Sequence, residues 1–321
     1  METRSHRRTF LVGSIATALA ARLITGVGSR EASASSLRAQ QAVDWQTVAQ
    51  ALGATGQRMD GDVFRIAMPR SDLAVTVKDV PILPSFALGS YAAFKQVGPT
   101  TGDTMVMGDL VLLDTEVNPV MSGLFDADFA ITGVHNHLNE MQPHVMYLHY
   151  MGQGDATTLA QGLRQALSAS ATPLGQQGTG TPQAAGTPTT DLPTAQLEEI
   201  LGRTGKVAKG GVVQFSVPRA ETITEGDIEL LPSMGVATVL NVQPIDGDQA
   251  AITGDFVLVA DEVNPVAQTL RAHSIEVTAL HNHHLMEDPR LFYMHFFATG
   301  DPADLARGLR AALDRTKSAK G

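Results

Sequence analysis

Histidines are the residues of this chain best suited to chemistry, because six of them form two sets of three with the same spacing. In each set two histidines flank one asparagine, and the third histidine follows twelve positions after the second. Imidazole nitrogens are frequent ligands of zinc and copper ions. The two sets are His135, His137 and His149, and His281, His283 and His295.

The alternation of side chains along a β-strand would aim two histidines of each set in one direction. In an extended strand His135 and His137 would share one face, and Asn136 would point to the other. The following run would bring His149 close if it paired antiparallel across the turn that contains Pro143. Three imidazoles leave one position of a zinc ion open, as in catalytic zinc sites. We expect one three-histidine metal site per half, with zinc as the first candidate and copper as the second.

Two other interpretations of the histidines stay open. They could form a buried cluster held by hydrogen bonds, or one set could bind a ligand while the other is vestigial. The string His-Asn-His is not the nuclease motif of that name, whose residues are dispersed over a ββα unit. That motif contacts a polyanion, which a chain of net charge −10 would repel.

A second shared block reads Glu-Val-Asn-Pro-Val and begins at Glu116 and at Glu262. One interpretation makes these two glutamates catalytic, as a general base beside metal-bound water, or a fourth metal ligand. The other interpretation, which we favour, makes Asn118 and Asn264 helix caps, with the glutamates near the positive end of the helix.

The surroundings of the histidines differ between the two copies. The second copy has more charged groups, although Glu140 gives the first copy a carboxylate of its own. If only one copy is catalytic, we expect it to be the second. The differing positions are Leu138, Met141, Gln142 and His144 in the first copy, and His284, Glu287, Asp288 and Arg290 in the second.

The elements that must position these residues occur twice. Residues 108–167 align with 254–313 without a gap, and 26 of the 60 positions are identical. We place the repeats at 44–167 and 194–315. Residues 168–193 consist largely of Gly, Thr, Ala, Pro and Gln, which predicts a flexible linker.

Each repeat has the pattern helix, several strands, helix, two strands, helix. Capping residues and apolar periodicity predict helices at 44–52, capped by Asp44, at 194–201, after Asn118-Pro119, and after Asp155, with strands between them. In the helix after Asp155, one face carries Leu159, Leu163, Ala166 and Leu167. The fold class is therefore α+β, with two tandem homologous domains that are each a largely antiparallel sheet with flanking helices. We expect the repeats to pack against each other with pseudo-twofold symmetry.

The first 34 residues have the three parts of an export signal. Arg7-Arg8 precedes an apolar stretch, and small residues follow at 32–34. The arginine pair resembles the twin-arginine type, which exports folded proteins. We expect a periplasmic or extracellular protein. The alternative is an uncleaved anchor, but Arg22 interrupts the stretch, and a spanning helix needs about 20 apolar residues.

Charge and cysteine content exclude several classes of partner and ligand. Without residues 1–34 the chain has 18 Lys and Arg against 31 Asp and Glu, a net charge of −13. We therefore expect no nucleic-acid partner, and no membrane association after signal cleavage. The chain has no cysteine, so any metal must be bound by nitrogen and oxygen atoms.

Four stretches of the second copy resemble a known family. They are Glu262-Val263-Asn264-Pro265, Thr278 to His283, Pro289-Arg290 to His295-Phe296, and Gly300-Asp301-Pro302. They are similar to the LppY/LpqO family of bacterial secreted proteins, a domain of unknown function that is often duplicated. The first copy matches more loosely and departs at Leu138 and His144. Some members look like lipoproteins, which the absence of cysteine rules out here, and the resemblance implies no established activity.

These observations predict an exported metal-binding protein. If it is an enzyme, we expect metal-assisted hydrolysis or a lyase step on a small-molecule substrate. The alternative is a non-catalytic module that buffers metal or binds a partner in the cell envelope, with structural histidines.

Overall fold

The two repeats form the same elements in the same order. The computed structural model of the chain describes residues 41–175 and 188–319, so the predicted export signal (1–34) and part of the predicted linker lie outside the described residues. The first repeat contains α1 (Trp45–Leu52), β1 (Gly56–Arg58), β2 (Phe64–Pro69), β3 (Val75–Val77), β4 (Val80–Ile82), β5 (Gly89–Gln96), β6 (Thr104–Leu113), α2 (Asp114–Asp126), β7 (Ala130–His135), β8 (Met141–Gln142), β9 (Val145–Gly154) and α3 (Ala156–Leu167). The second contains α4 (Thr194–Leu201), β10 (Lys206–Val207), β11 (Val213–Pro218), β12 (Ile223–Glu225), β13 (Ile228–Leu230), β14 (Ala237–Pro244), β15 (Ala250–Leu258), α5 (Ala260–Ala272), β16 (Glu276–His281), β17 (Glu287–Asp288), β18 (Phe292–Gly300) and α6 (Pro302–Leu313).

Each repeat is built on a six-stranded antiparallel sheet. The strand order is β1-β2-β5-β6-β9-β7 in the first repeat and β10-β11-β14-β15-β18-β16 in the second. Short strands form a three-stranded sheet beside each large one, in the orders β4-β3-β8 and β13-β12-β17. The predicted α+β class and tandem antiparallel domains are confirmed. Among the described residues, no helix is long and apolar enough to cross a membrane.

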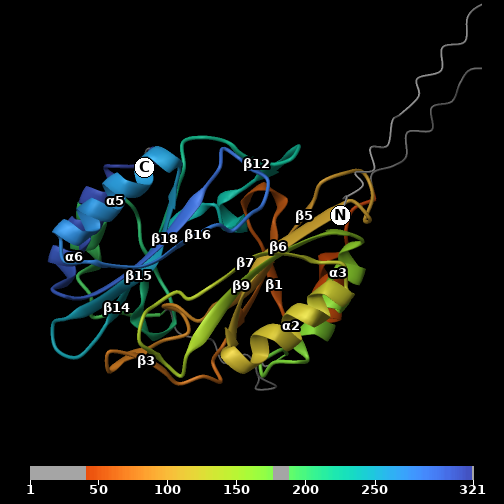
Figure 1. Cartoon of the computed structure of the whole chain (residues 1–321), viewed down its shortest axis with the longest axis horizontal. Coiled ribbons are helices and arrows are strands. Elements are labelled where there is room, and N and C mark those ends of the chain that lie inside the picture. The colour runs from red at the N-terminus through yellow and green to blue at the C-terminus, as the bar shows by residue number, and fades with distance from the viewer. Residues whose placement is uncertain (1–40, 176–187, 320–321) are drawn as a thin grey trace, which may run out of the picture. The chain divides into compact units, whose positions relative to one another are not determined.

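Helices cover one face of each large sheet. Figure 1 shows α2 and α3 on one side of the strands and α5 and α6 on the other. Helix α3 buries Leu159, Leu163, Ala166 and Leu167, which form the face predicted from their periodicity. Its N-cap is Asp155, which accepts hydrogen bonds from the amides of the first turn, as predicted.

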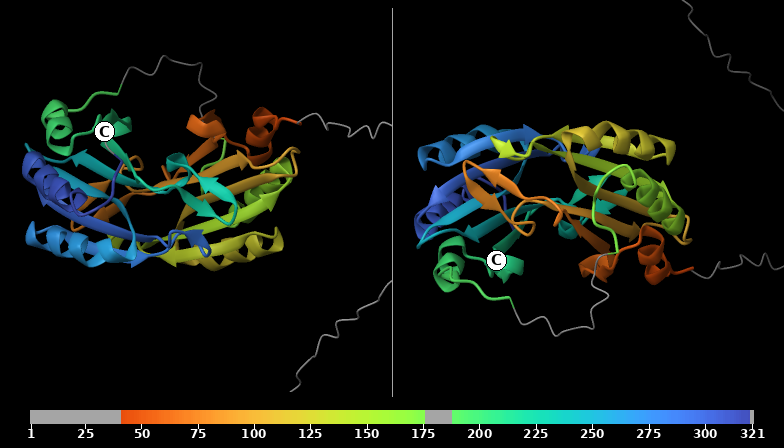
Figure 2. Two further views of the ribbon diagram at one scale, coloured as in Figure 1. Left: turned by 90° about the horizontal axis from the view of Figure 1, so that it is seen from above. Right: turned by 90° about the horizontal axis from the view of Figure 1, so that it is seen from below.

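The other face of each sheet packs against the other repeat. On β6, Val106, Leu110 and Leu112 belong to the helix-covered core. The alternate residue Val111 packs in a cluster that includes Val212 and Phe297 of the second repeat. Both repeats lie in one compact unit, Ala39–Gly321, and Figure 2 shows strands of both between the two groups of helices. Alternation along each strand therefore decides which side chains meet at the inter-repeat face.

The predicted start of the second helix of each repeat is wrong. Helix α2 begins at Asp114, so Asn118 lies inside it rather than at the cap, and Pro119 is also internal. The same holds for Asn264 and Pro265 in α5. Each helix begins directly after Leu113 or Val259, and neither residue has a capping side chain that the sequence could reveal.

Candidate metal centre

The third histidine of each set is directed to the inter-repeat face by strand alternation. On β9 the flanking residues Leu148 and Tyr150 face the helices, so His149 faces the second repeat. Strands β7 and β9 pair antiparallel, as expected, with His135 opposite Tyr147. The same pairing in the second repeat sets His281 opposite Tyr293.

The prediction that both histidines of the His-Asn-His string lie in one strand is wrong. Strand β7 ends at His135, and β16 ends at His281. His137 and His283 follow in the bends that lead to β8 and β17. The chain leaves the large sheet at this point because β8 and β17 pair with the small sheets instead. The third and first histidines of each set thus sit on the large sheet, and the second sits on the connection.

All six histidines gather where the two repeats meet. The rings of His135 and His281 are stacked, with centroids 3.4 Å apart. The second histidine of each set contacts the third histidine of the other set. The ring centroids of His137 and His295 are 3.5 Å apart, and those of His149 and His283 are 3.8 Å apart. The sequence predicted a separate group of three in each half, whereas the structure brings both groups into one cluster.

The Nε2 atoms of His281 and His295 face each other at close range. Nδ1 of His281 lies 3.2 Å from the carbonyl oxygen of Asn282, and Nδ1 of His295 lies 3.0 Å from that of Gly254. Because a carbonyl only accepts, we assign the ring hydrogen to Nδ1 in both, which leaves a lone pair on each Nε2. These two Nε2 atoms are 2.7 Å apart. Two lone pairs at this distance repel unless a cation lies between them.

Burial keeps five of the six imidazoles neutral, those of His135, His137, His149, His281 and His283. Burial, together with the neighbouring His295, lowers the pKa of His135 to about 3 and that of His281 to about 2. The pKa values of His137, His149 and His283 are also well below the ordinary value for the same reason. A proton is therefore a poor cation for these five rings, whereas neutral imidazole is the form that binds a metal ion.

Two groups of side chains converge closely enough to hold a metal ion. In the first group, His135 joins His281, His283 and His295, with one ligand atom from each residue and all of these atoms within 4.8 Å of one another. The second group consists of His137, Asp255 and His295. Both groups combine the two repeats and share His295. Among the described residues, His149 belongs to neither group.

Sequence reasoning missed two aspartates that stand beside the histidines. Asp255 on β15 is the register partner of His295 on β18, and its Oδ1 lies 2.5 Å from Nδ1 of that ring. Asp109 is likewise opposite His149, at 3.8 Å. Carboxylates that contact the outer nitrogen of a ligating histidine fix its orientation and raise its basicity. A signal existed, since Gly-Asp opens the aligned block in both repeats.

The two glutamates proposed as catalytic form buried ion pairs in the structure. Glu116 accepts hydrogen bonds from Arg70 and from the backbone amide of Leu113. Glu262 is bound in the same way by Arg219 and the amide of Val259. Neither glutamate belongs to the two convergent groups.

The charged residues specific to the second copy do not join the convergent groups either. Glu287 is buried and binds Arg290 and the amide of Leu291. Burial lowers the pKa of His284 to about 4, and neither ring nitrogen of this buried histidine has a hydrogen-bond partner in the described part of the chain.

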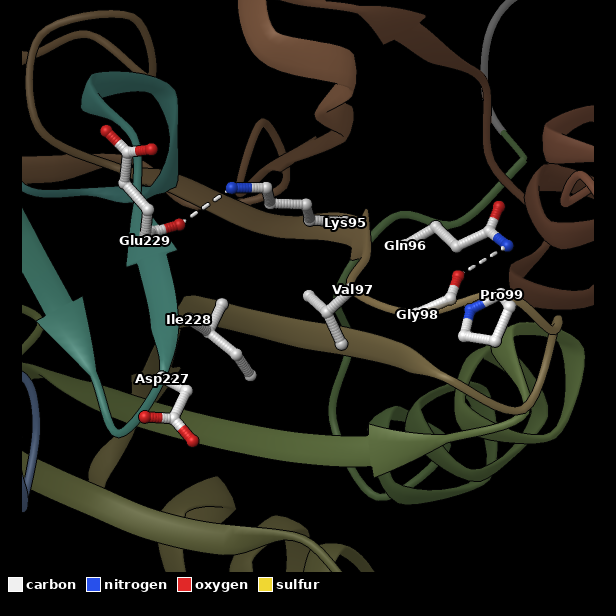
Figure 3. Close-up of a pocket in the computed structure, with 8 residues that line it drawn as sticks. All are labelled: Lys95, Gln96, Val97, Gly98, Pro99, Asp227, Ile228 and Glu229. Atoms are coloured by element: carbon white, nitrogen blue, oxygen red, sulfur yellow. Dashed lines mark hydrogen bonds between the residues drawn. The ribbon is translucent and has the colours of Figure 1, made fainter. Parts of the chain in front are cut away.

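A pocket of about 380 Å³ borders the histidine cluster. Its walls come from both repeats and include His137 and His283, as well as the two aspartates. Figure 3 shows a second pocket, whose volume is about 530 Å³. It is lined by residues 95–99 and 227–229, and Lys95 donates a hydrogen bond to the carbonyl oxygen of Glu229. Of these two pockets, the first has residues of the histidine cluster in its lining and the second has none.

Comparison with known proteins identifies a family but no activity. A family model described as Domain of Unknown Function (DUF1259) matches residues 46–169 and again 195–315. No curated protein matches the sequence. Among solved structures, the trimeric bacterial microcompartment shell protein PduB is 12% identical, with 82% of this chain and 95% of that chain covered and a TM-score of 0.20. EtuB from Clostridium kluyveri is 8% identical, with 82% and 91% covered and a TM-score of 0.19. Such low scores carry no argument about fold or function.

Proposed function

The chain belongs to the family described as Domain of Unknown Function (DUF1259), and we propose that it is an exported protein that binds one transition-metal ion between its two repeats. The ligands are His135, His281, His283 and His295. The convergence of these four imidazole nitrogens carries the proposal. The 2.7 Å contact between the Nε2 atoms of His281 and His295 supports it, because two neutral rings with the hydrogen on Nδ1 would repel each other there and a metal ion would remove the repulsion.

One ion per chain is proposed because the two convergent groups share His295. Two ions per chain, one in each repeat, is the arrangement expected from the sequence alone. Zinc is the first candidate and copper the second, since both accept imidazole nitrogen.

Metal content of the purified protein tests this proposal. The chain should contain about one zinc or copper ion, and the double substitution His281→Ala and His283→Ala should abolish it. The matched control is His144→Ala, which removes a half-exposed histidine bonded to Asp114. Unchanged stoichiometry in the double variant would overturn the proposal, and two ions in the wild type would favour one site per repeat.

A catalytic role as a metal-dependent hydrolase or lyase is a second candidate. It is favoured by the pocket that reaches His137 and His283, because catalysis needs an open coordination position beside a substrate site. A closed four-histidine site would instead suit metal buffering. The visible spectrum of the cobalt-substituted protein separates these cases: added azide should change the spectrum of an open site and leave that of a closed site unchanged.

Export is proposed from the twin-arginine-type segment. The change Arg7→Lys with Arg8→Lys should retain the protein in the cytoplasm, with the precursor uncut, and cell fractionation with N-terminal sequencing would measure this. Normal export of that variant would contradict the proposed route.

A further inference from the structure

The pocket between the repeats is asymmetric in charge. Arg65 is the one lysine or arginine among the residues that line it. Arg65 is the second residue of β2, and the second residue of β11 in the other repeat is Gln214, which lines the same pocket. The two repeats thus present different groups at equivalent positions of one shared space.

Arg65 is held in place without a carboxylate partner. Its Nη1 donates a 2.5 Å hydrogen bond to the carbonyl oxygen of Ser233, and its guanidinium lies 3.6 Å from the ring centroid of Tyr91. Within the described residues, no carboxylate oxygen lies within 4.0 Å of Arg65, whereas Arg70 and Arg219 each bind two carboxylates. A guanidinium fixed by stacking and free of an ion pair is prepared to bind an oxyanion with its fork of N–H donors.

Other polar atoms around the pocket also lack partners. Oδ1 of Asn241, Nδ1 of His137 and Nε2 of His283 are buried and form no hydrogen bond with any described residue, and the same holds for Oδ1 of Asp109 and of Asp255. All five residues line the pocket. Buried polar atoms are seldom left unpaired in folded proteins, so several of them around one cavity indicate a polar ligand.

We propose that this pocket binds a small molecule with a single carboxylate, which pairs with Arg65 while the rest of the molecule extends toward His137 and His283. The pocket volume of about 380 Å³ is that of a small-molecule site. One planar guanidinium matches one planar carboxylate, whereas a phosphate dianion would leave charge uncompensated. The metal ion beside the ligand rests on the proposed function, whereas the pairing of the carboxylate with Arg65 does not.

Binding of three carboxylates, namely acetate, lactate and 4-fluorobenzoate, to the purified full chain tests the inference by ligand-observed NMR. At least one should bind, and Arg65→Met should weaken it about tenfold or more, as expected for a charge-assisted bidentate pair. Arg58→Met is the matched control, since Arg58 is exposed on β1 and outside the pocket. The neutral 4-fluorobenzamide should not depend on Arg65. Circular dichroism and metal content of every variant are measured on the same samples.

Two sets of outcomes keep this inference separate from the metal proposal. Loss of carboxylate binding in Arg65→Met with unchanged metal content supports the inference. Absence of Arg65-dependent binding for all three carboxylates, or tighter binding of inorganic phosphate, overturns it and leaves the metal proposal intact. Arg65-dependent carboxylate binding by a chain that contains no metal would overturn the metal proposal alone.

Discussion

His135 and His281 stack with ring centroids 3.4 Å apart and an angle of 17° between their planes, although 146 positions separate them in the chain. The first lies at the end of β7 and the second at the end of β16, so the contact joins the edge strands of two sheets. A site built on this contact exists only when both repeats are in place.

His135→Ala should weaken metal binding although the other three ligands belong to the second repeat. The expected loss of zinc affinity exceeds the roughly 10- to 100-fold effect of an outer-shell change, because a ligand is removed. Competition with a chromophoric chelator measures it, with His144→Ala as control. Affinity equal to wild type would confine the site to the second repeat.

Asp255→Asn should lower zinc affinity by about 10- to 100-fold, because the carboxylate lies 2.5 Å from the outer nitrogen of the proposed ligand His295. Asp109→Asn is the matched control, since its partner His149 is 3.8 Å away and belongs to neither convergent group. Equal effects of the two changes on zinc affinity would contradict the assignment of His295, rather than His149, as a metal ligand.

Gly133→Ala should force the repeats apart at the metal centre. A Cβ atom at Gly133 would lie 2.8 Å from the backbone oxygen of Asn282 in the other repeat. We expect a loss of about 1–3 kcal/mol in the free energy of unfolding, as for overpacking, with weaker metal binding. Urea denaturation checks this. Gly300→Ala is the control, because its Cβ would meet nothing closer than 3.8 Å, and its stability should match wild type.

Glu116→Gln should change stability rather than metal content. Burial alone would raise the pKa of Glu116, but hydrogen bonds from Arg70 and from backbone amides hold it below its usual value. Because the folded-state pKa is lowered, the stabilisation is present above the unfolded-state pKa and is lost as pH falls through the folded-state value. The variant should lose about 3 kcal/mol near neutral pH, and its stability should depend less on pH below 5 than that of wild type.

Denaturation of both proteins between pH 7 and pH 3 measures the difference, with metal content determined at pH 7. A fall in bound metal without a fall in stability would instead support Glu116 as a ligand or base.

Local sequence patterns predicted much of the fold. Helix α1 follows its predicted cap Asp44, and the bounds of α4 agree with the prediction for 194–201. These features depend on neighbouring residues, whose capping and periodicity the sequence displays. The starts of α2 and α5 were missed because the preceding residues, Leu113 and Val259, carry no capping group.

The identity of the site histidines was visible in the sequence, but their grouping was not. Spacing within one repeat cannot reveal that His135 approaches His281, since that contact depends on how two sheets pack. Asp255 was missed because its closeness to His295 follows from the register of β15 and β18, which pair across 40 positions of chain. Such long-range register is specified by core packing rather than by local pattern.

Arg65 and Gln214 occupy equivalent strand positions of the two repeats, and both line one pocket. Had the same domain assembled as a homodimer of identical subunits, every side chain at this cleft would occur twice, and two arginines would face each other. Fusion into a single polypeptide removes that constraint, because each wall can be mutated on its own. The cleft is thereby positively charged on the side of Arg65 and neutral at Gln214.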